Sequence, residues 1–318
     1  MTRLNWLTGG TKASGWTALD AGVDGAMCAV SVRRGPGGRP QTVKCAHRAA
    51  GMPAAEALQE LAQQVAVLGF PWVMALQRSD YQMLVLSEPV VLAAEMEQSL
   101  RWALGSMVDY PISEAHVTWI KIPTAELQPN HAHQLYGIVA RHSLIKAQEA
   151  LFQKCKLSLQ ALDVRETGQR NIAALLEKKR EGLGLIYLAP AGVNITFTYD
   201  GELYLDRFIE QPLADLLLAD GAQRQEMFER IALQVSRSVD FIDRNFPFMP
   251  IQRMVVAPLP QPLGLTEYLA ANLSLPVEQL DLTLIFDLSL TPELAVPENQ
   301  WRYFIALGAA LRGLGNVA

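Results

Sequence analysis

The sequence contains little from which disulfides, a nucleic-acid surface or a membrane span could be built. Three cysteines occur among 318 residues, Cys28, Cys45 and Cys155, and no two of them have CxxC spacing. We therefore expect free thiols in a reducing compartment rather than a disulfide framework or a zinc site. The net charge of -5 leaves no basic stripe that could neutralise a phosphate backbone, which argues against direct binding to RNA or DNA.

Long apolar runs are also missing. The longest uncharged apolar runs are far short of the ~20 residues that span a bilayer, and residues 1–10 hold no apolar core of signal-peptide length. We therefore expect a cytoplasmic protein. Trp6 lies between Leu4 and Leu7 and could touch a membrane surface or a neighbouring subunit, but one short segment is too small to anchor a protein stably.

The sequence does contain a large supply of core residues, since half of it is hydrophobic, and a chain of this length can form two or more domains. The clearest pattern lies between Gly184 and Ile209. An apolar run ends at Pro190, a second run alternates in polarity, and Asp200-Gly201 gives a strong hairpin signal before a third run. This stretch predicts three consecutive antiparallel strands.

A shorter form of the same pattern occurs near the start of the chain. Residues 16–20 form an apolar run, 21–25 a turn of small residues, and 26–32 a second run. The repetition predicts a duplicated α/β fold with one strand-turn-strand unit in each half. We place the first domain at 1–86 plus 161–180, a small inserted α+β subdomain at 87–160, and the second domain at 181–318.

Four local patterns add detail. A helix is expected to begin at Ser87-Glu88-Pro89, because five apolar residues then recur at helical spacing: Leu92, Met96, Leu100, Ala103 and Met107. Ser143 is expected to cap the helix that follows it. Residues 282–286 are expected to form a strand, and 301–314 a helix buried between layers because its apolar side chains cover most of its circumference.

Several segments, in collinear order over most of the chain, carry a resemblance to a known family. The most telling are Arg170-Asn171-Ile172-Ala173-Ala174-Leu175-Leu176 and Ala306-Leu307-Gly308, with Ser236-Arg237-Ser238-Val239-Asp240-Phe241 between them. The chain resembles the PilM-like pilus assembly proteins, and within them the MshI proteins of mannose-sensitive haemagglutinin (MSHA) pilus biogenesis. The resemblance implies an actin-like, ribonuclease H-like duplicated fold of the FtsA type, with an SHS2-like insert.

The resemblance also implies partners and a location. Members of the family act as cytoplasmic platforms at the inner membrane and dock the cytoplasmic tail of a single-span pilus protein (PilN-like or MshJ-like). The tail lies near the junction of the first domain and the insert, which here corresponds to Val85–Val91 and Val139–Leu144. We therefore expect a cytoplasmic protein peripheral to the inner membrane. Self-association into a homo-oligomer stays open.

Actin-like proteins clasp nucleotide phosphates between two hairpin turns, each with an aspartate that orders the water around Mg²⁺. The first turn here keeps three candidate ligands, Asp20, Gly22 and Asp24. The matching positions of the second turn are Leu188-Ala189-Pro190, where a leucine replaces the acid and a proline has no N–H to donate. The adenine loop corresponds to Ala257-Pro258-Leu259-Pro260, which carries two more prolines.

These changes remove charge and donors that phosphate chemistry uses. We expect a non-enzymatic scaffold to which neither a cofactor nor a metal is assigned. The alternative is an ATP-binding switch or ATPase that uses Asp20 and Asp24 for Mg²⁺. A purely structural interpretation of the first turn is also open, in which Gly22 supplies a positive φ and Asp20 caps the turn.

Two further pairs of residues are candidates for a metal site and for a catalytic pair. His131 and His133 have the spacing of metal ligands on a strand, but no Asp, Glu or Cys stands near them in sequence, so a solvated loop is expected. His142 and Ser143 are adjacent, and adjacent residues on an extended chain point to opposite faces, which argues against a nucleophile and base pair.

Overall fold

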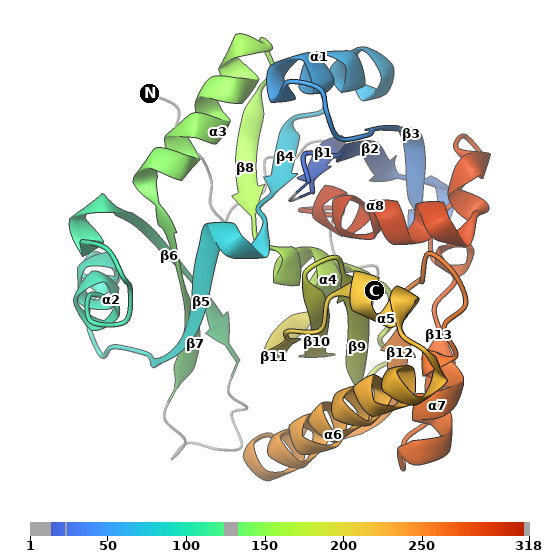
Figure 1. Ribbon diagram of the computed structural model, residues 1–318. Helices are drawn as coiled ribbons and strands as arrows, with labels where there is room; N and C mark the ends of the chain where they lie inside the picture. The colour runs from blue at the N-terminus through green and yellow to red at the C-terminus, as the bar shows by residue number, and fades with distance from the viewer. Residues whose placement is uncertain (1–13, 23, 124–132, 315–318) are drawn as a thin grey trace.

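The chain folds into two lobes, each built on a five-stranded sheet, with a smaller three-stranded sheet beside them (Figure 1). The structure, a computed structural model, describes residues 14–22, 24–123 and 133–314. In the first lobe the strand order is β3-β2-β1-β4-β8. The first three strands pair antiparallel, and β4 and β8 continue the sheet in parallel to β1. The bounds are Gly15–Ala21 (β1), Met27–Arg34 (β2), Pro40–Arg48 (β3), Trp72–Ala75 (β4) and Leu159–Asp163 (β8).

The second lobe repeats this order as β11-β10-β9-β12-β13, again with three antiparallel strands followed by two parallel ones. The turn between β10 and β11 places Asp200 at φ 53° and Gly201 at φ 75°, the left-handed pair that a two-residue hairpin requires. The predicted duplication and the predicted three-strand meander are both confirmed. The bounds are Gly182–Ala189 (β9), Gly192–Tyr199 (β10), Glu202–Ile209 (β11), Ile251–Val256 (β12) and Val277–Gln279 (β13).

Helices cover both faces of each sheet. Helix α1 (Ala54–Val65) packs on β2 and β3, and α8 (Pro297–Ala310) covers the opposite face of the first sheet, against β1, β2 and β4. In the second lobe α4 (Arg165–Leu176) packs on β9, β10 and β11, while α6 (Gly221–Asn245) covers the other face with α7 (Leu265–Asn272) beside it. The short helix α5 (Leu213–Leu218) leads from β11 towards α6. Helices α4 and α8 therefore lie between the two sheets, as Figure 1 shows.

The two central helices cross at a pair of glycines. A Cβ atom placed on Gly308 would lie 2.1 Å from the carbonyl oxygen of Gly168, so the crossing needs glycine at that position on α8. The side-chain amide of Asn171 donates to the carbonyl oxygen of Gly308 at 2.9 Å. The two sequence blocks that carried the family resemblance thus meet in space, and their small residues set the distance between the lobes.

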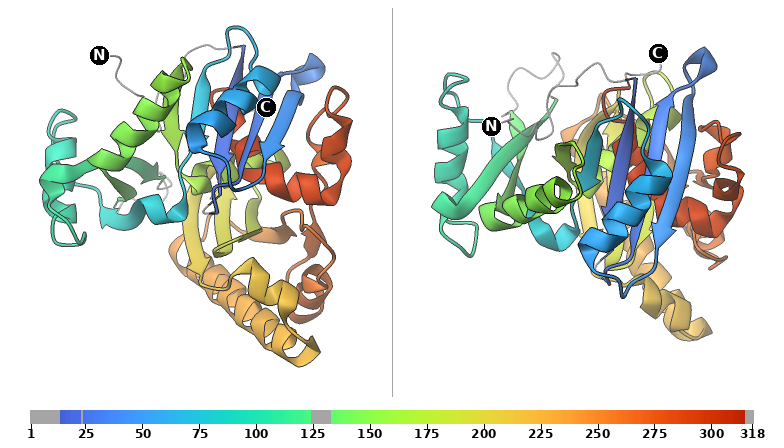
Figure 2. Two further views of the ribbon diagram at one scale, coloured as in Figure 1. Left: turned by 45° about the horizontal axis from the view of Figure 1, so that its top comes forward. Right: turned by 90° about the horizontal axis from the view of Figure 1, so that it is seen from above.

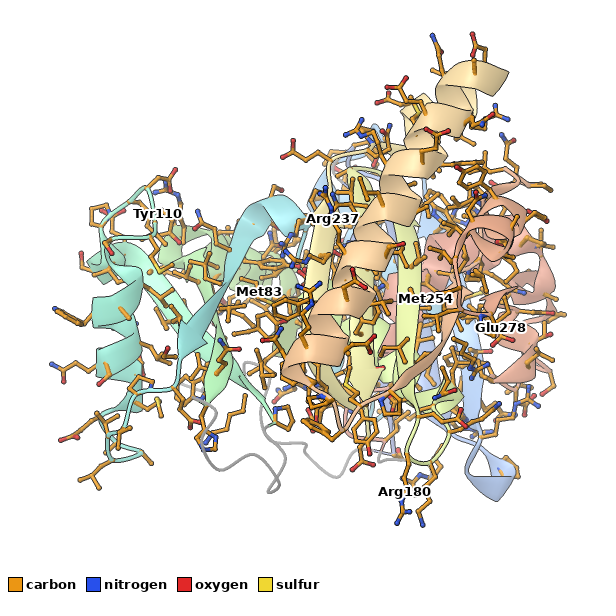
Figure 3. The ribbon with its side chains drawn as sticks, turned by 90° about the horizontal axis from the view of Figure 1, so that it is seen from below. Met83, Tyr110, Arg180, Arg237, Met254 and Glu278 are labelled. Atoms are coloured by element: carbon orange, nitrogen blue, oxygen red, sulfur yellow. The ribbon has the colours of Figure 1, made fainter. Side chains whose placement is uncertain are left out.

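The small sheet is formed by the insert, in the order β5 (Tyr81–Ser87), β7 (Gln134–Arg141) and β6 (Ala115–Ile122), all antiparallel. Helix α2 (Met96–Leu104) covers its outer face through Leu100 and Leu104. The inner face rests on both lobes: Ile138 joins the core of the first lobe and Ile122 that of the second. Figure 3 shows Met83 at the boundary between the insert and the second lobe.

A tyrosine fixes the insert to the second lobe. The phenol oxygen of Tyr136 on β7 accepts a hydrogen bond from the Asp206 backbone N–H (3.1 Å) and donates to the Tyr204 carbonyl oxygen (3.2 Å). Both backbone groups lie on β11, an edge strand of the second sheet. Helix α3 (His142–Lys154) then returns the chain to the first lobe, where Phe152 packs edge-on against Trp72.

Sheet membership differs from the predicted boundaries at two places. Strand 81–87 pairs with β7 of the insert, so the insert's sheet begins at residue 81 rather than 87. Helix α8 lies in the stretch assigned to the second domain, yet it packs on the first sheet. The burial of this helix is as predicted, since residues 303–310 are all buried. The division into domains as such stays a prediction.

Three local expectations are wrong. Helix α2 begins at Met96 rather than near residue 88. The residues after Pro89 form only an isolated turn, which is closed by a hydrogen bond from the Glu95 N–H to the Leu92 carbonyl oxygen. Residues 282–284 form a 3₁₀ turn, because the Asp281 side chain accepts from the Thr283 N–H and competes with strand pairing. Ser143 lies inside α3, whose N-cap is Arg141. Helix α3 starts directly where β7 ends, which leaves Ser143 no capping position.

Candidate functional site

A cavity between the lobes lies where the first hairpins of the two sheets face each other. It encloses about 360 Å³, and the side chains around it come from the first lobe, the second lobe and both central helices. Asp20 and Gly22 stand on the β1–β2 side, Tyr187 and Pro190 on the β9–β10 side. We call this cavity the cleft. The views in Figure 2 show how α8 lies against the first sheet beside it.

Asp20 is engaged by a cation from the protein itself. The Arg165 guanidinium donates to both carboxylate oxygens, Nη1 to Oδ1 at 2.7 Å and Nη2 to Oδ2 at 3.2 Å. Gln77 donates a third hydrogen bond to Oδ1 at 3.3 Å. Burial alone would lower the pKa of Arg165, but the charge and hydrogen bonds of Asp20, together with Tyr187 and Tyr81, outweigh burial and raise it. Arg165 therefore stays charged and holds both oxygens of Asp20.

The register of the first sheet explains this convergence. Asp20 is paired across the sheet with Ala75, the last residue of β4, so Gln77 follows within reach. Arg165 is the first residue of α4, directly after β8, which is the neighbour of β4. Residues just beyond the carboxyl ends of parallel strands gather at one edge of a sheet. The sequence analysis missed Arg165, although this rule applied to β8 could have pointed to it.

The rest of the first turn is held by internal hydrogen bonds. The Asp24 carboxylate accepts from the Ala26 N–H at 3.0 Å, and the Gly22 N–H donates to the Ala26 carbonyl oxygen. The positive φ belongs to Gly25, at 86°, rather than to Gly22. A Cβ on Gly22 would instead lie 2.5 Å from Asp24 Oδ1. The structural interpretation of the turn thus needs two corrections: Asp24 is the cap, and Gly22 provides space.

The second turn presents no acid to the cleft. Leu188, the position expected to face the phosphates, is buried in the core of the second lobe, because alternation along β9 turns Tyr187 towards the cleft instead. Pro190 lines the cleft at the turn. The Trp301 indole N–H, from α8, donates to the Leu188 carbonyl oxygen at 2.8 Å. Trp301 thus lines the cleft beside the second turn, a position that was not predicted from the sequence.

These groups do not fit a magnesium-bound nucleotide. Both oxygens of Asp20 are used by Arg165, the Asp24 oxygen is used within its own turn, and Pro190 offers no N–H. The prolines expected at the adenine loop, Pro258 and Pro260, follow β12. Among the residues that the structure describes, no cluster of three or more His, Cys, Asp or Glu could hold a metal ion.

A buried polar network extends from the cleft into the junction of the three sheets. Glu166, fully buried, accepts from Arg78 (2.7 Å) and from the Tyr81 hydroxyl (2.5 Å). Arg78 also lies 3.7 Å from the Asp206 carboxylate of the second lobe. Burial, followed by the nearby Glu166 charge, raises the pKa of Asp206 to about 7. The network joins α4, β5 and β11, so buried charges link the insert to the second lobe.

A second cavity lies where the insert leaves the first lobe, close to the segments at which a partner tail was expected. It encloses about 190 Å³ and is lined by Ser79, Asp80, Tyr81, Gln82, Asp109, Tyr110, Val139, Arg141 and Leu144. The Arg141 guanidinium lies 4.0 Å above the Tyr110 ring, which Figure 3 shows on the insert. We call this cavity the insert groove. Its floor combines apolar and aromatic surface with two carboxylates, and it includes Val139 and Leu144 of the expected segment.

The remaining sequence candidates lie at scattered places in the chain. All three cysteines are free thiols, and Cys28 is buried. Trp6 and His131 lie outside the described residues, and His133 is exposed just before β7. His142 and Ser143 lie in the first turn of α3. Within the described ranges, no helix is both long and apolar enough to cross a membrane.

No protein-family model matches the sequence, and no curated protein matches it. Solved structures do match. One is a chain of the PilM-PilN type IV pilus biogenesis complex, with a TM-score of 0.71, 17% identity, and coverage of 95% of this chain and 99% of that chain. Another is a Bacteroides thetaiotaomicron protein with an actin-like ATPase fold and unknown function, with a TM-score of 0.50, 7% identity, and coverage of 89% and 96%.

The duplicated sheets, the central helices and these likenesses define an actin-like fold. Over 95% of its length the chain is similar in fold to the chain from the pilus complex. The family resemblance predicted from the sequence is confirmed at the level of the fold.

Proposed function

We propose that this chain is a non-enzymatic scaffold of a type IV, MSHA-like pilus assembly platform. It works peripherally at the cytoplasmic face of the inner membrane and docks the cytoplasmic tail of a PilN-like or MshJ-like single-span protein. The observation that carries the proposal is the ion pair between Arg165 and Asp20, which occupies the carboxylate that a nucleotide-bound metal would use. The likeness to a chain of the PilM-PilN complex supports the choice of partner.

The tail is proposed to lie in the insert groove. The groove sits where the first lobe meets the insert, and its residues come from three separate segments: 79–82, 109–110 and 139–144. A short extended peptide can contact all three at once, with apolar residues against Tyr110 and Leu144 and a polar end near Asp80. Such a contact holds two proteins together without any chemical step.

Calorimetric titration tests the proposal, with the purified chain and a synthetic tail peptide of the PilN-like protein from the same organism. We expect binding in the micromolar range, weakened at least about tenfold by Leu144→Asp, a loss of roughly 1.4 kcal/mol. Leu218→Asp is a matched control, because Leu218 is 86% exposed and lies on α5 of the other lobe. No heat at high micromolar peptide, or equal losses in both variants, would reject this site.

The alternative is a nucleotide-dependent switch, and the cleft itself favours it: two hairpin turns still face each other across about 360 Å³. A thermal-shift measurement with MgATP separates the two functions. The scaffold predicts no stabilisation. Stabilisation by MgATP that disappears in an Asp20→Ala variant would instead establish the switch.

A further inference from the structure

Five consecutive apolar residues on the insert are exposed. Residues 90–94 (Val-Val-Leu-Ala-Ala) connect β5 to α2, and all five are exposed, with Val90 fully so and Leu92 at 72%. Trp102 on α2 is 87% exposed. A run of this kind differs from the isolated exposed leucines elsewhere on the molecule, because contiguous apolar surface is typical of an interaction site.

Helix α2 explains why these side chains stay outside. Its buried positions, Met96, Leu100 and Leu104, recur every fourth residue and pack on the small sheet. Trp102 falls between them on the opposite face, roughly 9 Å along the axis from the start of the helix. Figures 1 and 2 show α2 on the side of the insert that faces away from both lobes. Residues 90–94 and Trp102 are exposed on the segment that forms this outward side of the insert, and together we call them the apolar arm.

The segment that carries the arm has an excess of negative charge. Residues 88–114 contain five carboxylates and a single arginine. That arginine, Arg101, pairs with Glu97 on the same helix at 3.0 Å. Glu88 pairs with Lys121 of β6 and Asp109 lies 3.7 Å from Arg141 of β7, while Glu95 and Glu114 are exposed. The surface therefore combines apolar contact area with an acidic rim.

The charge decides between three occupants. An anionic bilayer surface would be repelled by the rim, and a second copy of the chain would bring the same acidic rim against it. A basic, partly apolar protein segment is attracted to it. The cytoplasmic residues next to a membrane span carry an excess of Lys and Arg, so the membrane-proximal segment of a single-span partner has the required charge.

We propose that the apolar arm binds the basic, membrane-proximal segment of the inner-membrane partner, as a second contact beyond the tail in the insert groove. The inference rests on the proposed function for the identity of the partner. The kind of contact is inferred from the apolar arm alone. Apolar side chains of the segment pack on Leu92 and Trp102, and its lysines or arginines lie near Glu95.

The first experiment uses probes that do not depend on the partner. Fluorescence anisotropy of the full chain is measured with a labelled helix-forming peptide of leucine and lysine and with its leucine–glutamate counterpart. We expect binding of the basic peptide only. The Leu92→Ser/Trp102→Ser variant should weaken it at least about tenfold. The matched control, Leu68→Ser/Leu218→Ser, changes two leucines that are 101% and 86% exposed elsewhere and should leave affinity within about twofold.

The result that overturns the proposal is equal binding of the acidic peptide, or equal losses in the variant and its control. Sedimentation with phosphatidylglycerol–phosphatidylethanolamine vesicles gives a separate answer: vesicle binding that is lost in the Leu92→Ser/Trp102→Ser variant would make the arm a bilayer contact and reject the protein partner.

A second experiment separates this inference from the proposed function. Two partner peptides are titrated, the tail alone and the tail extended to the membrane span. The arm variant should weaken the extended peptide about tenfold and leave the tail alone unchanged. An extended peptide that binds the variant as tightly as the unaltered chain rejects only the arm. A tail that does not bind at all rejects the groove, while the lysine-peptide measurement still reports on the arm.

Discussion

Arg165 and Asp20 form a two-point ion pair on the first-lobe side of the cleft, with each guanidinium nitrogen on a separate carboxylate oxygen, at 2.7 and 3.2 Å. Both side chains are about nine-tenths buried. Breaking such a pair from one side leaves an uncompensated buried charge, which costs more than the pair itself contributes.

We therefore expect Arg165→Met to lower the free energy of unfolding by about 3 kcal/mol, measured by urea denaturation. Asp20→Asn combined with Arg165→Met should recover most of the loss, because the charge that was left alone is removed. A single variant as stable as the unaltered chain would contradict the buried ion pair, and with it the main support for an inert cleft.

The helix crossing makes a prediction about the interface between the lobes. Gly308→Ala places a methyl group against the Gly168 backbone, and because backbone cannot rotate away, the two helices must separate. We expect a loss of about 3 kcal/mol by urea denaturation. Gly221→Ala is the control, since nothing lies within 4 Å of a Cβ at the start of α6. That variant should stay within about 0.5 kcal/mol of the unaltered chain.

Asp206 gives a prediction about pH. Its pKa is raised from 3.8 to about 7 in the folded protein, by burial first and by the Glu166 charge second. The folded state therefore binds a proton that the unfolded state has lost over this range, so the contribution of Asp206 to stability falls as pH rises from about 4 to 7. Asp206→Asn keeps an oxygen for the Asn194 amide and carries no charge.

The measurement is the unfolding free energy at several pH values between about 4 and 7 for the two proteins. We expect the difference between Asp206→Asn and the unaltered chain to grow in favour of the variant as pH rises. Comparing the two proteins cancels the other titrating groups. A difference that does not change with pH would show that Asp206 titrates near its ordinary value.

Tyr136 gives a prediction about the insert. Tyr136→Phe keeps the ring but removes the hydroxyl that serves the Tyr204 carbonyl and the Asp206 N–H. Two backbone groups lose their partner, which costs about 2 kcal/mol. Hydrogen exchange should rise in β11 and in the strands of the insert, with little change in β1 and β2. Uniform protection across all three sheets would mean that this contact does not hold the insert in place.

The sequence predicted the duplicated meander because its turns carry specific residues, above all Asp200-Gly201, whose backbone conformation few other pairs adopt. It also predicted that the second turn lacks a hydrogen-bond donor, because Pro190 has no backbone N–H. Arg165 and Trp301 could not be predicted from local pattern, since their roles depend on strands and helices far away in the chain. The start of α2 was missed because apolar spacing alone does not show where an exposed run ends and a buried helix begins.

Helix α8 has a consequence for how the protein is made. The Cys28 thiol on β2 donates to the Arg302 carbonyl oxygen on α8, across 274 positions of sequence, and α8 covers one face of β1, β2 and β4 in the first sheet. During synthesis the strands of that sheet leave the ribosome long before the helix that shields them. Trp16 and Val30 must therefore remain uncovered until residues 297–310 have been synthesised, so the first lobe reaches its native packing only after the second lobe has left the ribosome.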